Sequence, residues 1–369
     1  MRFVTFLNSK NQQRAGILVQ NATQNTTSSD LAGTKSGTIP GTIIDIRDAI
    51  QWLNSPESPQ DLATKTPSAL PLPFDMLDVI REQDVLLPAL KRIVGYFQES
   101  QPSSASQAFK FPKTLIYNEN QVRLVSPIPH PLSMRDGYAF RQHVETARRN
   151  RGLAMIPEFD QFPVFYFTNH LAVTGPGDVA VRKLTQDKLD FELEVAVVIG
   201  KECRNVSAAD ADQYIFGFMV MNDWSARTLQ MEEMKLNLGP AKGKDFATSL
   251  GPYLVTRDEL SKHVVSGQAS NSGESHNLWM KAYVNGKQLS EGNLKDMNWT
   301  FAQLIERVSY GVTLQPGEVI GSGTVGTGCL LELNGSKITD NLWLKPGDEV
   351  IMEVEALGRL ENRVLAADE

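Results

Sequence analysis

Three acidic residues, Glu192, Glu194 and Asp223, stand in or close after segments that are otherwise mostly apolar. Residues 189–195 alternate between apolar and acidic side chains, a pattern typical of a half-buried strand, so Glu192 and Glu194 share one face. The apolar run 215–221 leads to Asp223. Because buried carboxylates are costly unless they are paired, the pattern favours a bound cation. The alternative interpretation is a solvated strand face followed by a turn.

Asp136 and His143 offer two further chemical groups. Ser133 has the character of a helix N-cap with an acid three residues later, and the predicted helix runs to about Asn150, where Gly152 ends it. Seven residues make almost two turns, so Asp136 and His143 share a face, about 10 Å apart along the axis. One side chain can then ligate a metal while the other acts on a substrate atom. The alternative for Asp136 is a structural role at the positive end of the helix dipole.

Four acids make up the candidate ligand set, and no histidine or cysteine stands at metal-ligand spacing beside them. Such a set of hard oxygen ligands suits Mg²⁺, Ca²⁺ or Mn²⁺ and argues against structural zinc. A divalent cation with nearby donors suits a substrate that chelates through adjacent oxygens and develops enolate charge. The predicted ligands are Asp136, Glu192, Glu194 and Asp223.

Three further residues offer hydrogen-bond donors beside these acids. A helix that begins at its expected N-cap Ser225 places Arg227 and Gln230 next to each other on its surface. Lys244 lies in the turn-rich loop 239–246. The alternative for all three is an ordinary solvated surface. A histidine near an interior acid could in addition act as a general base on water.

Residues 321–326 match the G-x-G-x-x-G pattern of dinucleotide-binding loops. The apolar segment 329–333 that follows is predicted to be a strand, so the helix dipole that would hold a pyrophosphate is missing and we reject a Rossmann site. The loop can still bring backbone N–H groups close to a substrate carboxylate. Glu332 stands within the predicted strand as another acid among apolar neighbours.

Composition limits the class of protein. The chain has 369 residues, more than one hydrophobic core usually serves, so we predict two domains of unequal size. The formal net charge of -7 argues against nucleic-acid and membrane-surface partners. Two cysteines, Cys203 and Cys329, are too few for a disulfide framework and fit a reducing compartment. Neither a secretory signal nor a transmembrane run is recognisable, and we expect a cytoplasmic protein.

Residues 1–110 are predicted to form a small β domain with a helical segment, and residues 111–369 the larger domain. Residues 21–41 have the composition of a flexible insertion, and residues 99–107 that of a linker. In the larger domain, the predicted elements include a hairpin that turns at residues 285–286 and a helix over 301–308. The N-terminal elements are predicted as strands at 2–6, 14–19 and 42–46 and helices at 46–53 and 76–97, the last broken near Pro88.

Seven sequence motifs follow one another along the second part of the chain. They are Arg135-Asp-Gly-Tyr-Ala-Phe-Arg-Gln-His143, Pro163-Val-Phe-Tyr166, Asp190-Phe-Glu-Leu-Glu194, Met221-Asn-Asp-Trp-Ser-Ala-Arg227 with Gln230, Gly243-Lys-Asp-Phe246, residues 321–328 and Leu331-Glu332. Each motif is modest alone, but seven in this order are specific. Through them, the chain from about residue 122 onward resembles the fumarylacetoacetate hydrolase family. Residues 1–110 are also similar, less specifically, to the small SH3-like domain of two-domain members.

The resemblance implies a strand-rich α+β fold, a mixed β-sandwich roll, that binds Mg²⁺ or Ca²⁺ through the four acids. It implies that His143, oriented by Glu332, activates water, and that family members commonly form homodimers. Arg227, Gln230 and Lys244 would stabilise the enolate that leaves when a C–C bond breaks. The substrate's oxygens would be held by Tyr138, Tyr166 and Thr324.

Three functions are compatible with these residues. The first is a hydrolase that cleaves a C–C bond in a β-diketo acid such as an acylpyruvate or fumarylacetoacetate. The second is a decarboxylase or tautomerase that uses the same metal on oxaloacetate or a related 2-oxo acid. The third is a metal-stabilised scaffold without activity. Only hydrolysis requires a water-activating pair, and His143 with Glu332 therefore favours it.

Overall fold

The computed structural model describes residues 1–20, 41–59, 62, 71–101, 110–265 and 272–367. The chain divides into two compact units, residues 1–124 and 125–369. Residues 21–40 of the predicted insertion and residues 102–107 of the predicted linker lie outside the described residues. The domain boundary between residues 110 and 111 that we infer from the sequence stays a prediction.

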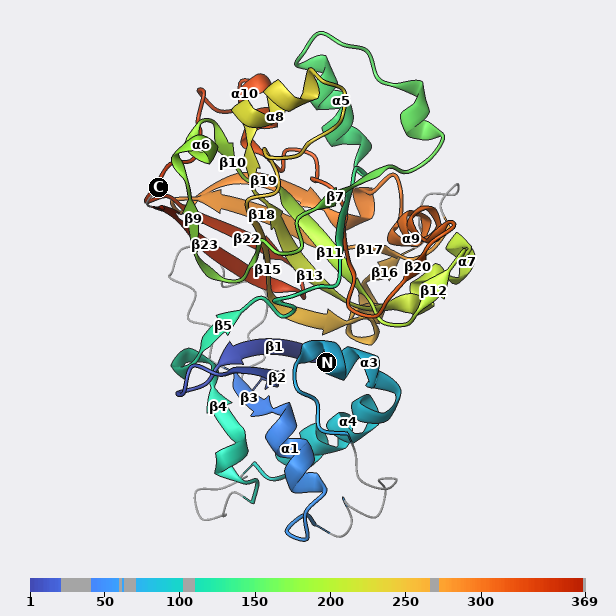
Figure 1. Cartoon of the computed structure of the whole chain (residues 1–369), viewed down its shortest axis with the longest axis vertical. Helices are drawn as coiled ribbons and strands as arrows, with labels where there is room; N and C mark the ends of the chain where they lie inside the picture. Colours follow the sequence, from blue (N-terminus) through green and yellow to red (C-terminus); the bar gives the residue numbers. More distant parts are fainter. Residues whose placement is uncertain (21–40, 60–61, 63–70, 102–109, 266–271, 368–369) are drawn as a thin grey trace. The chain divides into compact units, whose positions relative to one another are not determined.

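In the first unit, four antiparallel strands lie in the order β4-β3-β2-β1 (Figure 1). Asp45, at the end of β3, begins the first helix because its carboxylate accepts a hydrogen bond from the Asp48 N–H, and it also receives two bonds of 2.7 Å from Arg14. An SH3-like topology for this unit remains a prediction. The elements are β1 (Arg2–Leu7), β2 (Gln13–Val19), β3 (Thr42–Asp45), α1 (Ile46–Leu53), α3 (Met76–Arg81), α4 (Gln83–Glu99), β4 (Ile116–Asn118) and two 3₁₀ turns, Lys113–Leu115 and Glu119–Gln121; β5 (Arg123–Val125) spans the division.

The second unit contains two large sheets of mixed direction. In the first sheet the order is β15-β13-β11-β21-β6-β7, with β21 parallel to β6 and β8 parallel to β15. In the second the order is β19-β18-β22-β23-β9, with β9 parallel to β23. The first sheet comprises β15 (Thr248–Thr256), β13 (Ile215–Asp223), β11 (Leu193–Ile199), β21 (Val319–Gly321), β6 (Met134–Gly137), β7 (Phe165–Thr168) and β8 (Val173–Thr174); the second comprises β19 (Lys287–Asn293), β18 (Trp279–Val284), β22 (Glu349–Val354), β23 (Gly358–Ala366) and β9 (Gly177–Val181).

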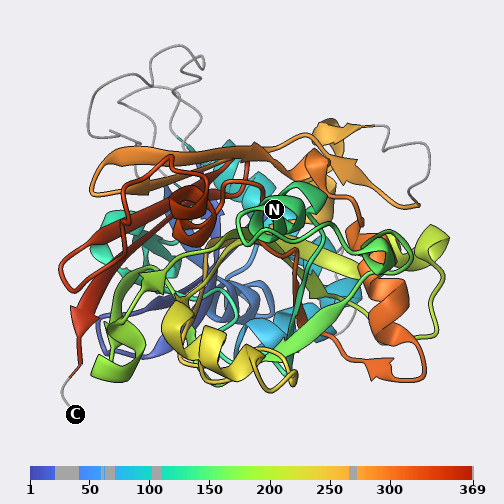
Figure 2. The ribbon, with the colours of Figure 1, turned by 90° about the horizontal axis from the view of Figure 1, so that it is seen from above.

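The two sheets face each other across the main hydrophobic core. Val197 of β11 and Phe218 of β13 belong to the same buried cluster as Met280 of β18 and Met352 of β22. Figure 2 shows the orange and red strands of the second sheet as a layer along one side of the yellow-green strands. All seven residues of β11 are buried, as expected of a strand covered on both faces. The strand-rich α+β sandwich predicted from the sequence is therefore confirmed.

Helices α5, α8 and α10 gather at one end of this sandwich (Figure 1). Three further helices, short strand pairs and 3₁₀ turns make up the remaining described elements of the second unit. The helices are α5 (Arg141–Arg149), α6 (Lys183–Gln186), α7 (Ala208–Ala211), α8 (Arg227–Met234), α9 (Phe301–Ser309) and α10 (Leu330–Gly335); the short strand pairs are β10 (Leu189–Asp190) with β14 (Ser225–Ala226), β12 (Cys203–Arg204) with β20 (Thr313–Leu314) and β16 (Val264–Val265) with β17 (Ser275–His276); the 3₁₀ turns are Pro157–Asp160, Asp212–Tyr214, Arg257–His263 and Leu294–Asp296. Among the described residues, no helix combines the length and apolar character that crossing a membrane requires.

The predicted helix from Ser133 to Asn150 is wrong in its first half. Residues 134–137 form strand β6, which pairs with β21 and β7, and the helix begins only at Arg141. The Ser133 hydroxyl donates to Glu318 Oε2 at 2.7 Å and caps nothing. Pairing with a strand distant in the chain has overridden a local helix-start pattern. Asp136 and His143 therefore lie on different elements, and the helical distance predicted between them does not apply.

Other boundaries also differ from the predictions. Helix α8 begins at Arg227, and Ser225 lies in β14, where its hydroxyl donates to the Asp223 carbonyl. The break in the N-terminal helical segment falls at Glu82 between α3 and α4, while Pro88 lies inside α4. The hairpin turn at residues 285–286 and the helices at 46–53 and 301–308 match the prediction.

Candidate metal-dependent active site

The structure brings the four predicted acids together. One carboxylate oxygen from each lies within 4.8 Å of the others, and all four residues are buried. Strand pairing explains the convergence, since β6 and β13 lie on either side of β11 and β21 in the same sheet. Asp136 comes from β6, Glu192 from the residues just before β11, Glu194 from β11 and Asp223 from the end of β13.

Two oxygens of this cluster have no hydrogen-bond partner among the described residues, Oε2 of Glu194 and Oδ1 of Asp223. Burial and the neighbouring acid Asp223 raise the pKa of Asp136 to about 7. Burial and Asp136 likewise raise the pKa of Glu194 well above its ordinary value. Buried acids that lack partners and repel one another fit a site for a hard divalent cation, which supplies the missing positive charge.

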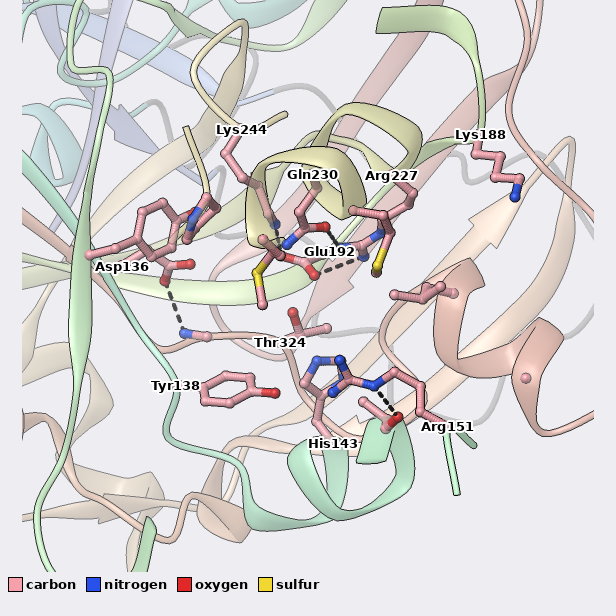
Figure 3. Close-up of a pocket in the computed structure, with 18 of the residues that line it drawn as sticks. Asp136, Tyr138, His143, Arg151, Lys188, Glu192, Arg227, Gln230, Lys244 and Thr324 are labelled. Atoms are coloured by element: carbon pink, nitrogen blue, oxygen red, sulfur yellow. Dashed lines mark hydrogen bonds and ion pairs between the residues drawn. The ribbon is translucent and has the colours of Figure 1, made fainter. Parts of the chain in front are cut away.

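Glu192 differs from the other acids because cations surround it. Burial alone would raise its pKa, but Lys244 and Arg227 hold that pKa well below the ordinary value. Lys244 Nζ donates to Glu192 and, at 2.8 Å, to Asp223 Oδ2. Arg227 Nη2 donates to Glu192 Oε1 at 2.8 Å. Figure 3 shows Glu192 between the two cations. The Glu192 carboxylate is therefore ionised at neutral pH whether or not a metal is bound.

Arg227 is fixed by contacts that use three of its five N–H groups. Besides Glu192, it donates through Nε to Asp190 at 2.7 Å and through Nη1 to Gln230 Oε1 at 2.9 Å. The predicted adjacency of Arg227 and Gln230 on helix α8 is thus present in the structure. Both residues line the cavity beside the acids. Lys244 uses two of its three donors, so each cation retains a donor for a ligand.

His143 lies on the opposite wall of the same cavity (Figure 3) and pairs with the buried Glu332. His143 Nδ1 lies 2.7 Å from Glu332 Oε2, and the other carboxylate oxygen accepts the Thr327 N–H at 2.9 Å. When Nδ1 donates to the carboxylate, Nε2 is left as an acceptor for water. Cys329 lies near the pair, and burial raises the pKa of its thiol well above the usual value. The pair has the geometry of a general base with a positioning carboxylate.

Tyr138, Tyr166 and Thr324, the predicted substrate-binding residues, all line the cavity. The Tyr166 hydroxyl donates to Asp223, and the Thr324 hydroxyl lies 3.3 Å from Glu194. Burial and Glu192 raise the pKa of Tyr138 to about 12, so its hydroxyl remains a donor at neutral pH. Two of the three residues therefore also contact the acids.

The glycine-rich loop 321–326 serves the acids and not a dinucleotide. The Gly323 N–H donates to Asp136 Oδ1 at 3.1 Å, and a Cβ on Gly321 would overlap the same carboxylate. The strand predicted for residues 329–333 is wrong, because Leu330–Gly335 form helix α10. The first N–H groups of α10, on Leu330 and Leu331, are already bound by Asp190 at 2.7 and 3.0 Å. These two N–H groups are therefore already used and are not available to a pyrophosphate.

Asp190 is the main functional residue that we did not single out in the sequence. It is fully buried, binds Arg227 and begins α10, the helix that carries Glu332. One carboxylate thus positions groups on both walls of the cavity. Strand alternation places it on the same face as Glu192 and Glu194. Its contacts with Arg227 and with the start of α10, however, depend on segments far away in the chain.

The family described as fumarylacetoacetate (FAA) hydrolase C-terminal matches residues 133–365, which include every residue of this site. The chain belongs to the fumarylacetoacetate hydrolase family. The resemblance seen in the sequence motifs is therefore confirmed, and the family's named members include enzymes.

Members of the family with different activities are similar to this chain. It is 28% identical over 299 residues to oxaloacetate tautomerase YisK of Bacillus subtilis (strain 168), covering 79% of this chain and 87% of that protein. It is 31% identical over 243 residues to fumarylacetoacetase of Oryza sativa subsp. japonica, covering 53% and 56%. A structure of maleylpyruvate hydrolase from Sphingobium sp. SYK-6, in complex with manganese(II) and pyruvate, has the same fold, with a TM-score of 0.61, 19% identity and full coverage of both chains.

The raised pKa of Asp136 predicts how a metal stabilises the protein. Between about pH 4 and pH 7 the folded metal-free protein keeps a proton that the unfolded chain has lost, so the contribution of this group to stability falls as pH rises through that range. A divalent cation takes the place of the proton. We expect saturating Mn²⁺ to raise the melting temperature by roughly 5–10 °C at about pH 8 and by much less at about pH 5.

Differential scanning fluorimetry of chelator-treated protein measures this effect, with NaCl at matched ionic strength as the control. An equal shift at both pH values, or none at either, would contradict a cation site built from these acids.

Proposed function

We propose that this protein hydrolyses a C–C bond in a β-diketo acid of the acylpyruvate or fumarylacetoacetate type. The observation that carries the proposal is the His143–Glu332 pair, whose imidazole lines the same cavity as Asp136 and Glu192 of the four-acid cluster. Hydrolysis requires a base that activates water next to a site that stabilises enolate charge. Both parts are present within one cavity.

His143 accepts a proton from water through Nε2 while Glu332 holds the other side of the ring. The water oxygen adds to the acyl carbonyl carbon, and the C–C bond to the methylene carbon breaks. The bonding electron pair passes to the pyruvate fragment as an enolate, which then takes up a proton at carbon. An acylpyruvate and water thus give a carboxylate, pyruvate and one released proton.

The remaining donors of Arg227 and Lys244 are available to the oxygens on which negative charge develops. A divalent cation bound by the four acids would polarise the adjacent oxygens of the diketo acid as a Lewis acid. We propose Mg²⁺ or Ca²⁺ as the resident ion, with Mn²⁺ as a substitute. Calorimetric titration of these three ions and of Zn²⁺ into chelator-treated protein tests the choice, and equal affinity for Zn²⁺ would argue against it.

A second candidate activity is tautomerisation or decarboxylation of oxaloacetate at the same site, which the similarity to named oxaloacetate tautomerases favours. It requires enolate stabilisation and proton transfer at carbon, but no addition of water. The products formed from an acylpyruvate and from oxaloacetate therefore distinguish the two activities.

The decisive experiment incubates the Mg²⁺-loaded protein with acetylpyruvate and, in parallel, with oxaloacetate, each with and without chelator. We expect loss of the diketone absorbance and formation of equal amounts of acetate and pyruvate, both abolished by chelator. Turnover of oxaloacetate with no cleavage of any acylpyruvate would overturn the hydrolase assignment and support the second candidate.

We further propose a homodimer in the cytoplasm. The β7 region presents Phe167 and Leu171, 65% and 78% exposed, and the segment after α8 presents Leu236 and Leu238, 80% and 91% exposed. Exposed apolar side chains of this size commonly pack in subunit interfaces. Cys203 and Cys329 are both unpaired, which suits a reducing compartment. Light scattering after size-exclusion chromatography tests the dimer, and cell fractionation tests the location.

A further inference from the structure

The cavity beside the acids is larger than a small diketo acid requires. Its volume is about 850 Å³, in the upper part of the roughly 300–1,000 Å³ range of ligand pockets. Part of its wall is apolar and comes from the β7 region, helix α8 and the segment before residue 344. The apolar lining residues include Val164, Phe165, Met231, Met234, Pro240 and Trp343. A substrate with an extended acyl chain would cover this wall.

Lys188 lies in the cavity wall at the side away from Asp136, with Arg227 between them (Figure 3). Its Nζ is 6.0 Å from the ring centroid of Trp343. Among the described residues, none of the ion pairs involves Lys188. The preceding acid, Asp187, instead accepts a hydrogen bond from the Thr228 hydroxyl at 2.8 Å. Lys188 is therefore a cation of the cavity wall that is available to an anionic ligand.

The backbone fixes Lys188 at this point of the wall. Its φ of 52° is in the left-handed region, which is uncommon for lysine. The Lys188 carbonyl accepts the Arg227 N–H at 3.2 Å, and the next residue, Leu189, accepts the Leu344 N–H at 2.9 Å. The second contact keeps Lys188 beside Trp343. A lysine held in a left-handed conformation, where asparagine or glycine is the easier residue, suggests that the side chain has a function.

Other charges around the cavity favour an anion as well. Arg151 and Lys235 also line it, against one exposed acid, Glu232. By contrast, Arg227 and Lys244 are already paired with Asp190, Glu192 and Asp223. The unpaired positive charge is thus separate from the charge that holds the acid cluster together.

We propose that Lys188 recognises a second carboxylate at the far end of the acyl chain, so that the preferred substrates are diketo acids with an anionic group at both ends. The proposal rests on the proposed function, because that function fixes the end of the substrate that lies against the four acids. From there the acyl chain would follow the apolar wall, and its terminal carboxylate would reach Lys188 beside Trp343.

Two substrates of equal chain length test this inference, an acylpyruvate with an alkyl tail and one whose tail ends in a carboxylate. Asparagine tolerates a left-handed backbone, so Lys188→Asn removes the charge without straining the fold. We expect Lys188→Asn to raise KM for the carboxylate-tailed substrate about fivefold at unchanged kcat and to leave the alkyl-tailed substrate unaffected. Charge reversal in Lys188→Glu should enlarge this difference.

Lys183→Asn is the matched control, because Lys183 is exposed on α6 and does not line the cavity. An equal effect of Lys188→Asn on both substrates, or an effect on neither, would overturn the role of Lys188. If the wild-type protein cleaves neither substrate, the proposed function fails separately. Calorimetric binding of the same two compounds to Mn²⁺-loaded protein then decides about Lys188, since a selective fivefold loss for the carboxylate-tailed compound supports it and equal affinities reject it.

Discussion

We expect the His143→Ala variant to lose roughly 10²–10⁴-fold in kcat for an acylpyruvate, with little change in KM. The imidazole is the one base that lines the cavity with a carboxylate fixed behind it, at 2.7 Å from Glu332, in the part of the chain that the structure describes. Without it, water must add to the carbonyl without a proton acceptor. Steady-state kinetics measured by pyruvate formation gives the result directly.

The matched control is His130→Ala, which removes an exposed histidine that does not line the cavity and should leave kcat unchanged. Glu332→Gln should lower kcat less, by about 10–100-fold. This substitution removes the carboxylate that orients the imidazole ring, but the imidazole itself is retained as the base. The His143→Ala and Glu332→Gln variants should both still show the melting-temperature shift with Mn²⁺. Full turnover by His143→Ala would contradict the hydrolase assignment and favour a reaction that needs no activated water, such as tautomerisation or decarboxylation.

The parts of the site that could be predicted are those specified by local sequence. The alternation before β11 and the apolar run of β13 predict buried strands, and acids placed within such strands converge when the strands pair. The prediction of Glu192, Glu194 and Asp223 as neighbouring buried acids therefore required only the sequence around each of them. Arg227 and Gln230 were predicted as neighbours for the same reason, since helical spacing alone brings them together.

The predictions that failed depend on partners far away in the chain. Asp136 lies on a strand because β21 supplies its neighbour, and the N-cap pattern at Ser133 is overridden by a hydrogen bond to Glu318. Residues 330–335 form a helix because the carboxylate of Asp190 binds its first N–H groups. Lys188 had no sequence pattern at all, since its position depends on a left-handed backbone and on the segment at Leu344.

Two neighbouring glutamates should respond in opposite ways to the same substitution. Glu192 has a pKa held low by Lys244 and Arg227, whereas Glu194 has a pKa raised by burial and by Asp136. In metal-free protein at about pH 7, Glu192→Gln removes a carboxylate from two buried ion pairs, so we expect a loss of about 3 kcal/mol in the free energy of unfolding. That loss corresponds to a melting temperature roughly 6–12 °C lower. Glu194→Gln replaces a carboxyl group whose ionised form is disfavoured by burial and by Asp136, so the free energy of unfolding should change much less.

The pH dependence provides an independent check. A depressed pKa contributes stability above the pKa of the unfolded chain, about 4.3 for glutamate, and that stability is lost as pH falls toward the lower folded value. The difference between wild type and Glu192→Gln should therefore shrink when urea unfolding is measured at about pH 4 or below. For Glu194 the sign is reversed, because a raised pKa costs the metal-free protein stability as pH rises.

Metal binding links the two variants, since both carboxylates belong to the cluster. Calorimetry should show weaker Mn²⁺ binding for Glu192→Gln and for Glu194→Gln alike, although only the first destabilises the metal-free protein. Equal destabilisation by both substitutions would mean that Glu194 is ionised and paired without a metal. In that case the orphaned oxygens of Glu194 and Asp223 would no longer require a cation, and the metal-dependent chemistry would lose its structural basis.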